Sequence, residues 1–346
     1  MAEQASDDRD GAARRKFLHH FQSFNASIRF PAPYTGFAGK PMKHIAERGY
    51  VYDPLGYRTD ALPGPRAAED LRIFAVGDST LLEGLSTPDT LPGRLETVLR
   101  ATHGARTRVY NFGAISACLN QMTALITTRL MDMEPDLILV VGGATDIFQP
   151  WSFDPRAGYP FDHFVTECLQ DYFFDPKDPL EPAPPLSYEN LQALIFQRLA
   201  NLRALTLWQS EPWEWEVVRQ FELGLKRLAR LSRGLDIPVR FVLQPTVVRK
   251  TTLVGDERSV ASGAFLAYLD RQVERFARVV AGVGDGPLAG PHFGVHDLSA
   301  AFRDDARALF TDIVHVDSFG RQALAERLAA DLDAVLPRPV QAEASA

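Results

Sequence analysis

Four short segments of this chain have the character of buried strands, and they constrain the fold more than any other feature; the clearest, residues 136–143, is almost continuously apolar. They are residues 71–78 (LRIFAVGD), 107–114 (TRVYNFGA), 136–143 (DLILVVGG) and 238–244 (PVRFVLQ). Each is short enough to be a buried strand, and a weaker fifth strand is expected at 292–298. Strands without a polar face are typical of a parallel sheet that helices cover on both sides.

Amphipathic segments fill the intervals between these strands. Apolar residues recur at steps of three and four and so form one face of a helix. In the segment after the second strand they are Leu119, Met122, Ile126, Leu130 and Met133, and near the end of the chain they are Leu324, Leu328, Leu332 and Val335. Asp317 or Ser318 is a suitable cap for the last helix. We therefore expect an α/β fold, a three-layer α/β/α sandwich with a parallel sheet of about five strands.

An insertion at about 150–215 interrupts this alternation, directly after the third strand. It is rich in Pro, Phe and Tyr, and it contains all four tryptophans: Trp151, Trp208, Trp213 and Trp215. Ligands of open α/β sheets bind beside the carboxyl ends of the strands, where this insertion begins. It is either an extra packing subdomain or a wall or lid over a site, and the two roles are compatible. Phe148 and Trp151 are candidates for a substrate wall.

Composition excludes several classes of partner. With a net charge of −7 and no run of basic residues, the chain has no sign of nucleic-acid binding. The polar N-terminus is unlike a signal peptide, and no segment is apolar enough to span a bilayer, so we expect a cytoplasmic protein. The oligomeric state cannot be read from the sequence. Cys118 and Cys168 have no metal-ligand spacing and are expected to be reduced, partly buried thiols.

The two ends of the chain are polar and are expected to be disordered tails, at residues 1–14 and 337–346. Between them we expect one domain, residues 15–336, with residues 150–215 as its insertion.

The sequence Gly77-Asp78-Ser79-Thr80 follows the first predicted strand. A serine here lies at the mouth of the expected crevice, at a helix start whose backbone N–H groups face a developing oxyanion. Taken alone, Ser79 could equally cap a helix.

A second segment changes this balance. Asp312 and His315 are three residues apart in a predicted loop before the last helix. A serine hydroxyl needs a base to accept its proton, and the base needs a partner that fixes its ring and its tautomer. The D-x-x-H spacing provides a base and its orienting carboxylate within one short loop.

Two further segments follow the second and third predicted strands. They are 111–116 (NFGAIS) and 142–146 (GGATD). Because the carboxyl ends of parallel strands lie at one edge of the sheet, all these segments are expected to meet in one crevice. Asp146 is interpreted as a structural loop carboxylate rather than a second acid or base.

The order G-D-S, N-x-G, G-x-x-D and D-x-x-H resembles the SGNH (GDSL-like) hydrolase superfamily. The resemblance covers about residues 50–335 without the insertion, and it includes residues 53–60 (DPLGYRTD), 241–247 (FVLQPTV) and 309–320 (LFTDIVHVDSFG), which resemble a bacterial branch associated with surface-polysaccharide genes. It implies a flavodoxin-like sheet, with Ser79 as nucleophile, His315 as base and Asp312 as its orienter. Asp78, Asn111 and Asp146 would support them.

The chain departs from this family's pattern at two positions. The last glycine of N-x-G-x-x-G, which donates a backbone N–H to the oxyanion, is Ser116 here. The asparagine of G-x-N-D, another donor, is Thr145, whose hydroxyl is shorter but can still donate. The expected oxyanion donors are therefore the backbone of Ser79, Gly113 and Ser116 and the side chain of Thr145.

The remaining sequence features give little indication of function. His292 and His296 are four residues apart, but Gly294 lies between them and a third ligand is missing, so no metal is expected. The motifs G-x-S-x-G, G-x-G-x-x-G and the P-loop are absent, and no cofactor is expected. Tyr57 and Arg58 are expected to order the loop before the first strand, although Arg58 could instead contact an acidic substrate.

The leading interpretation is an esterase that acts through an acyl-Ser79 intermediate on a small ester. The family resemblance implies a carbohydrate ester, of the O-acetyl type. One alternative is a weak or inactive SGNH-like protein that binds a glycan or a protein partner, and another is an O-acyltransferase that excludes water behind the aromatic insertion.

Overall fold

The structure is a computed structural model that describes residues 29–45, 50–160, 163–164, 166–168, 188–260 and 264–336. The two expected tails, 1–14 and 337–346, lie outside the described residues, as does part of the predicted insertion.

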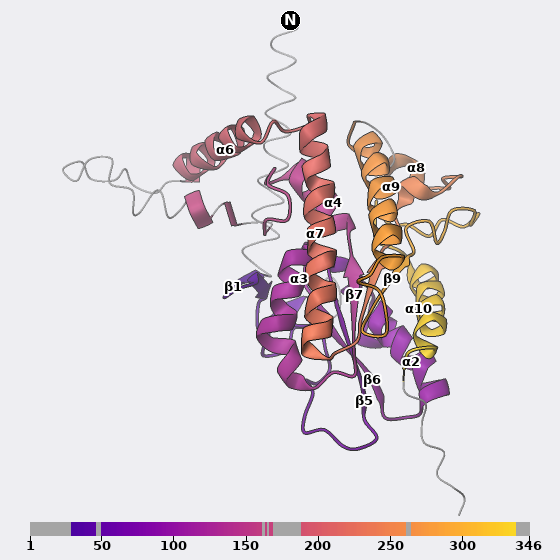
Figure 1. The fold of residues 1–346 in the computed structure, drawn as a ribbon. Coiled ribbons are helices and arrows are strands. Elements are labelled where there is room, and N and C mark those ends of the chain that lie inside the picture. Colours follow the sequence, from indigo (N-terminus) through magenta and orange to yellow (C-terminus); the bar gives the residue numbers. More distant parts are fainter. Residues whose placement is uncertain are drawn as a thin grey trace, which may run out of the picture.

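A five-stranded parallel sheet forms the centre of the molecule (Figure 1). Its strands, in the spatial order β6-β5-β7-β8-β9, are β6 (Thr107–Gly113), β5 (Leu71–Gly77), β7 (Leu137–Gly142), β8 (Val239–Leu243) and β9 (Phe293–Asp297). Numbered from β5 along the chain, this order is the doubly wound, flavodoxin-like one. Each strand lies within one residue of the segment predicted for it, so the expected fold class is confirmed.

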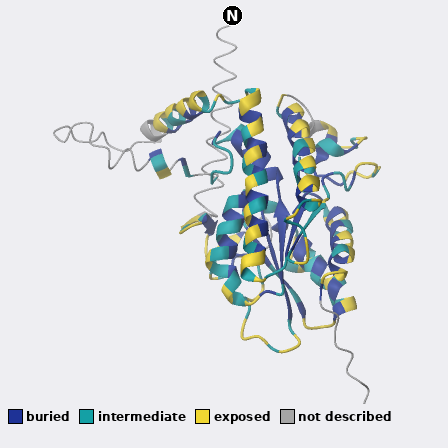
Figure 2. Ribbon diagram, in the orientation of Figure 1, coloured by how far each residue is buried: buried dark blue, intermediate teal, exposed yellow. Residues whose placement is uncertain are grey.

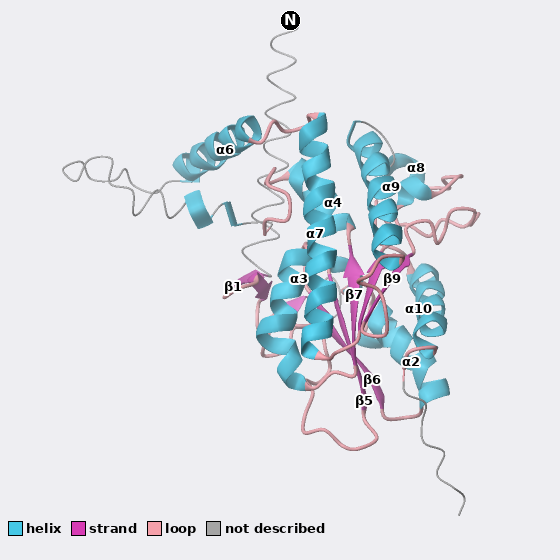
Figure 3. Ribbon diagram, in the orientation of Figure 1, coloured by secondary structure: helices cyan, strands magenta, loops and turns pink. Residues whose placement is uncertain are grey.

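Helices cover both faces of the sheet, which gives the three expected layers (Figures 1 and 3). Ile73 and Ala75 of β5 pack in one cluster with α2 (Leu91–His103) and α10 (Ser318–Asp333). Phe74 and Val76 of the same strand pack in a second cluster. The helices of that cluster are α3 (Leu119–Leu125), α7 (Glu211–Leu235) and α9 (Ala264–Gly284). Figure 2 shows the buried strands between these exposed helix faces. The strand alternation therefore separates the core into two halves that share one sheet.

The two predicted amphipathic helices are present. The first begins with α3 and continues through a π-helical turn (Ile126–Leu130) and a 3-10 turn (Met131–Met133), so its backbone is less regular than the spacing predicted. The second is α10, where the Asp317 side chain accepts a hydrogen bond from the Gly320 N–H at 2.8 Å, as expected for its cap.

Several smaller elements surround this framework. They are the antiparallel pairs β1 (Arg29–Ala32) with β2 (Gly36–Gly39) and β3 (His44–Ile45) with β4 (Tyr50–Val51), the 3-10 turns η2 (Ser79–Leu81), η3 (Thr87–Asp89) and η6 (Val247–Arg249), and the helices α4 (Ala144–Ser152), α6 (Tyr188–Leu205) and α8 (Glu257–Val260). None of the four short strands was expected from the sequence.

The aromatic residues of the insertion make packing contacts. Trp151 and Trp213 both stack on Tyr268 of α9, with ring centroids 4.5 and 5.5 Å away. The indole N–H of Trp213 also donates to the Pro155 carbonyl at 2.8 Å. The packing role expected for this region is therefore present in its described part, whereas its role as a wall or lid stays a prediction.

Other expectations have a direct structural counterpart. Cys118 and Cys168 are buried and are not joined in a disulfide. Arg58, which was expected to order the loop before the first strand, is 1% exposed and donates to the carbonyls of Leu82 and Gly84, so its bonds join that loop to the segment after β5. In the described part of the chain, no helix has the length and apolar composition that crossing a membrane requires.

We expect Phe276→Ala to lower the free energy of unfolding by about 3–5 kcal/mol, because truncating a buried aromatic side chain leaves a cavity. Phe276 is 0% exposed and stacks on Phe221 of α7 with centroids 3.8 Å apart, so it joins α7 to α9. Urea unfolding measures this change. Phe319→Ala is the control: that ring is 69% exposed, and its loss should leave the unfolding free energy within about 0.5 kcal/mol. Equal effects of the two substitutions would contradict the packing described here.

Candidate active site

Ser79 lies at the carboxyl end of β5, as the first residue of the turn η2. Its neighbour Asp78 caps this turn by accepting hydrogen bonds from the Thr80 N–H at 2.9 Å and the Thr80 hydroxyl at 2.8 Å. The capping role that the sequence left open for Ser79 therefore belongs to Asp78. The hydroxyl of Ser79, which is partly exposed, is directed to a residue from the other end of the chain.

That residue is His315. Its Nε2 lies 2.8 Å from the Ser79 Oγ, across 236 positions of sequence, and its Nδ1 lies 2.5 Å from the Asp312 Oδ2. The other oxygen of Asp312 accepts hydrogen bonds from the N–H groups of Val314 and His315, at 2.9 and 2.8 Å. The Asp312 carboxylate is thus fixed by the backbone of its own loop, and the imidazole is fixed by the carboxylate.

The charges around His315 favour its protonated form. Burial lowers the pKa of His315, but the hydrogen bond to Asp312 and the negative charges of Asp312, Glu83 and Asp78 outweigh burial and raise it above its usual value. Burial raises the pKa of Asp312, but its bonds to the imidazole and backbone lower it to about 2. An imidazolium formed during proton transfer from Ser79 would therefore be stabilised.

Glu83 was not identified from the sequence. Its Oε1 lies 3.9 Å from the His315 Nε2, the nitrogen that also faces Ser79. No periodic signal marks it in the sequence, because the 3-10 turn η2 ends at Leu81 and Glu83 lies in the loop that follows.

The residues expected as oxyanion donors have different environments. The Gly113 N–H donates to the Asn111 side chain at 3.0 Å, and Asn111 in turn donates to the Leu81 carbonyl at 2.7 Å. Asn111 therefore joins the end of β6 to the turn that carries Ser79. Ser116 has a φ of 54°, in the left-handed region that favours glycine, which explains why the related motif has glycine there.

Thr145 has a partner that the sequence did not predict. Its side chain is 0% exposed, and its hydroxyl donates to the Asp78 Oδ2 at 2.8 Å. Both Asp78 oxygens are therefore used, one in the Ser79 turn and one at the start of α4. The oxyanion role predicted for Thr145 requires the same proton, so this geometry favours a role in fixing Asp78.

Asp146, which was expected to be a structural loop carboxylate, lies in the first turn of α4. Both of its carboxylate oxygens lie 3.1 Å from the Leu119 N–H at the start of α3. Burial, together with repulsion from Asp78, raises its pKa to about 7 although this backbone bond acts in the other direction. The two wall candidates of α4 differ from each other: Trp151 stacks within the aromatic cluster, and Phe148 is half-buried.

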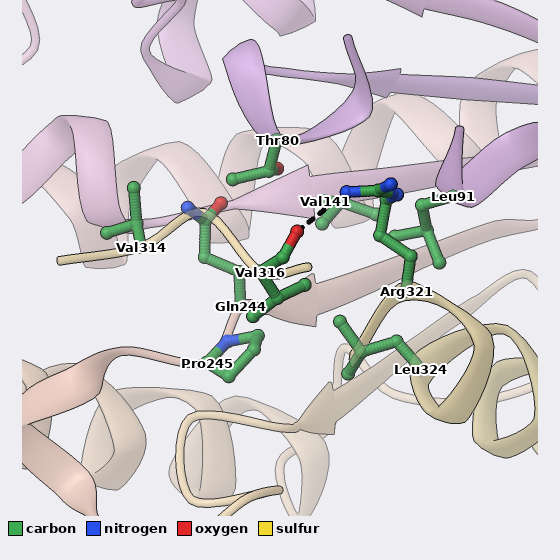
Figure 4. Close-up of a pocket in the computed structure, with 9 residues that line it drawn as sticks. All are labelled: Thr80, Leu91, Val141, Gln244, Pro245, Val314, Val316, Arg321 and Leu324. Atoms are coloured by element: carbon green, nitrogen blue, oxygen red, sulfur yellow. Dashed lines mark hydrogen bonds between the residues drawn. The ribbon is translucent and has the colours of Figure 1, made fainter. Parts of the chain in front are cut away.

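A small cavity lies behind the loop of Asp312 and His315, and Figure 4 shows its lining. Thr80, next to Ser79, and Val314, next to His315, both line it, together with Gln244 from the end of β8. On its other side Arg321 of α10 donates to the Val316 carbonyl at 2.7 Å and forms an ion pair with Asp89, also at 2.7 Å. Arg321 thus connects the histidine loop to the segment that follows Ser79.

Within the described residues, no group of three or more His, Cys, Asp or Glu side chains could bind a metal ion. His292 and His296 instead approach separate carboxylates, Asp236 at 3.5 Å and Asp331 at 3.2 Å.

The chain matches no family model, and no curated protein sequence matches it. Among solved structures it is similar to the acetyl xylan esterase AlAXEase, with 10% identity, a TM-score of 0.45 and coverage of 76% of this chain and 100% of the other. It is also similar to the lipase/acylhydrolase from Enterococcus faecalis, with 14% identity, a TM-score of 0.44 and coverage of 79% of this chain and 100% of the other. A third similar structure is Axe2, an acetylxylan esterase from Geobacillus stearothermophilus, with 13% identity, a TM-score of 0.40 and coverage of 79% of this chain and 97% of the other. Similarity this low carries no argument about the chemistry of this chain. The doubly wound α/β fold is established by the sheet order of the chain itself.

We expect Glu83→Gln to lower the pH midpoint of activity. A carboxylate 3.9 Å from the imidazole stabilises the imidazolium, so its removal lowers the pKa of His315. A base must be neutral to accept a proton, so activity rises with pH through that pKa. The measurement is the pH dependence of kcat/KM, whose wild-type midpoint should lie above 6.5. Glu69→Gln, at an exposed site beside Arg106, is the control, and an unchanged Glu83→Gln midpoint would refute the assignment.

We expect Thr145→Val to lower the free energy of unfolding by about 1.5–3 kcal/mol, because it removes the hydrogen bond to the Oδ2 of the buried Asp78 carboxylate and leaves only the bonds from Thr80 to Oδ1. Thr145→Ser keeps the hydroxyl and should cost less. Urea unfolding and kcat together separate the two roles. An oxyanion donor would instead show a drop in kcat of about a hundredfold with stability nearly unchanged.

Proposed function

We propose that this chain is a serine hydrolase that cleaves small esters through an acyl-Ser79 intermediate. The observation that carries the proposal is the continuous contact from Ser79 to His315 to Asp312, at 2.8 and 2.5 Å. The contact between Ser79 and His315 is not required by the local structure of either residue, because Asp78 already caps the turn and Asp312 already binds the Nδ1 of the ring.

In this mechanism the Nε2 of His315 accepts the Ser79 proton while the Oγ attacks the ester carbonyl. The imidazolium then donates that proton to the departing alcohol, which leaves an acyl group on Ser79. In the second half of the cycle His315 accepts a proton from water as the water attacks the acyl carbon. The bond between the acyl group and the Ser79 Oγ then breaks, the acid leaves, and the imidazolium returns the proton to Oγ. Asp312 fixes the tautomer with its proton on Nδ1, so that Nε2 is the free acceptor.

The backbone N–H groups of Ser79 and Ser116 are the proposed oxyanion donors. Ser79 begins a helical turn, where N–H groups are not yet used within the helix. Ser116 adopts the left-handed backbone angles of the glycine that the related motif carries at this position. Because the donors are backbone groups, the change from glycine to serine keeps the donor.

A carbohydrate ester of the O-acetyl type is the proposed substrate class. The support is the sequence resemblance of residues 53–60, 241–247 and 309–320 to the surface-polysaccharide branch. We also propose that the aromatic insertion forms a wall of the substrate site.

We expect a fluorophosphonate probe to label the wild-type protein and not Ser79→Ala, because the probe requires a nucleophile that a base activates. Hydrolysis of 4-nitrophenyl acetate should disappear in the same variant, while its melting temperature stays nearly unchanged. Ser86→Ala is the matched control, since Ser86 is exposed and its side chain makes no capping bond.

Equal labelling of Ser79→Ala would overturn the nucleophile assignment. A wild-type protein that is folded but inert to the probe would favour the alternative of a glycan- or partner-binding protein. Product analysis with and without an added sugar alcohol distinguishes hydrolysis from acyl transfer.

A further inference from the structure

The loop that carries Asp312 and His315 lies outside the sheet, between β9 and α10. Its two sides pair with each other through a single antiparallel bridge between Phe310 and Val316. The Thr311 N–H donates to the His315 carbonyl at 2.9 Å, and the Asp317 N–H donates to the Leu309 carbonyl at 2.8 Å. These bonds shape the loop internally, but they do not place it relative to Ser79.

Glu257, the first residue of α8, contacts the incoming side of this loop. Its Oε1 accepts hydrogen bonds from the N–H groups of Leu309 and Phe310, both at 3.0 Å. Its Oε2 accepts one from the Val254 N–H, also at 3.0 Å. The side chain is fully buried, so water cannot replace these bonds.

Lys250 completes the arrangement. Its Nζ lies 2.9 and 2.7 Å from the two oxygens of Glu257 and donates to the Arg307 carbonyl at 2.6 Å. Its side chain is 1% exposed. The three donors of the ammonium thus match three acceptors, and the pair together binds the backbone of residues 307, 309 and 310.

The stability of the fold does not by itself account for such a pair. Desolvating two charges costs free energy, and replacing a buried ion pair by apolar side chains of similar size is often neutral or stabilising. This pair binds the entry of the loop. The segment that carries Lys250 also contacts the tip of the loop, where the Val247 N–H donates to the Ile313 carbonyl at 3.0 Å. The contacts are therefore concentrated on the part of the chain that carries the proposed base.

We propose that Lys250 and Glu257 are positioning residues, which hold the loop of Asp312 and His315 at proton-transfer distance from Ser79. This inference rests on the proposed function, because it assigns the pair a role in that reaction. Displacement of a reacting group by about 1 Å reduces rates by about a hundredfold. Because the pair fixes the entry of the loop, its loss should lower kcat and leave KM nearly unchanged.

The test compares Glu257→Gln and the double variant Lys250→Met/Glu257→Met with the wild type. The double variant removes both charges and keeps much of the side-chain volume, but it leaves the N–H groups of Val254, Leu309 and Phe310 without an acceptor. Its unfolding free energy should therefore fall, and the rates are compared on folded protein. Its kcat for 4-nitrophenyl acetate and its rate of fluorophosphonate labelling should fall at least tenfold, with KM within about twofold. Arg249→Met is the control: Arg249 precedes Lys250, but its ion pair with Asp270, at 3.2 Å, faces α9 and not the loop. It should keep wild-type rates.

A second readout does not depend on esterase activity. NMR titration of the His315 ring should show a lower midpoint in the variants, because the displaced ring moves away from Glu83 and Asp78 while it keeps Asp312 in its own loop. If the wild type does not react with the probe, the proposed function fails, and the titration midpoint of His315 then tests by itself whether the pair positions the ring. A folded double variant with wild-type kcat, labelling rate and midpoint would overturn the proposal. If the double variant does not fold, Glu257→Gln is judged by the same criteria.

Discussion

The site depends on one constraint: a loop outside the sheet must present an imidazole to a serine at the end of a strand. The Ser79 side is fixed by the parallel sheet, because β5 pairs with a strand on each side. The His315 side has no such framework, and polar contacts replace it. Glu257 binds the entry of the loop, Arg321 binds its exit at Val316, and the Val247 N–H binds its tip. The distance between His315 and Ser79 therefore depends on three separate segments rather than on the loop alone.

Polar side chains beneath the site connect the strand ends in the same way. Where strands stop, backbone groups lose their ladder partners and must find others. Asn111 bridges the end of β6 to the Ser79 turn, Asp78 bridges that turn to Thr145, and Asp146 bridges α4 to α3. Each bond is buried, so each costs free energy when one partner is removed. This network explains how a crevice built from loop residues can be rigid.

The substitution of threonine in the G-x-N-D motif is explained by the same network. A shorter side chain fits a position where the hydroxyl meets a buried carboxylate 2.8 Å away. Ser116 differs in kind, because there the backbone conformation is kept and only the side chain changes. The two departures from the family pattern therefore have different consequences, one for a hydrogen-bond partner and one for backbone strain. In the aromatic insertion, where the sequence predicted a packing role, a wall role or both, the rings of Trp151 and Trp213 pack on Tyr268.

The sequence by itself determined the sheet and the residues at its carboxyl edge. Short apolar runs mark the buried strands, and a period of about 3.6 residues marks the helices; both patterns are local and can be read from the chain. The spacing of Asp312 and His315 is local as well, since the carboxylate and the ring lie in one turn of backbone. Contacts between distant segments leave no periodic trace, and so Glu83 beside His315, Thr145 beside Asp78 and Glu257 beneath Phe310 were decided only by the tertiary structure. The short strands β1 to β4 belong to the same class, because two to four residues are too few for a period to be recognised.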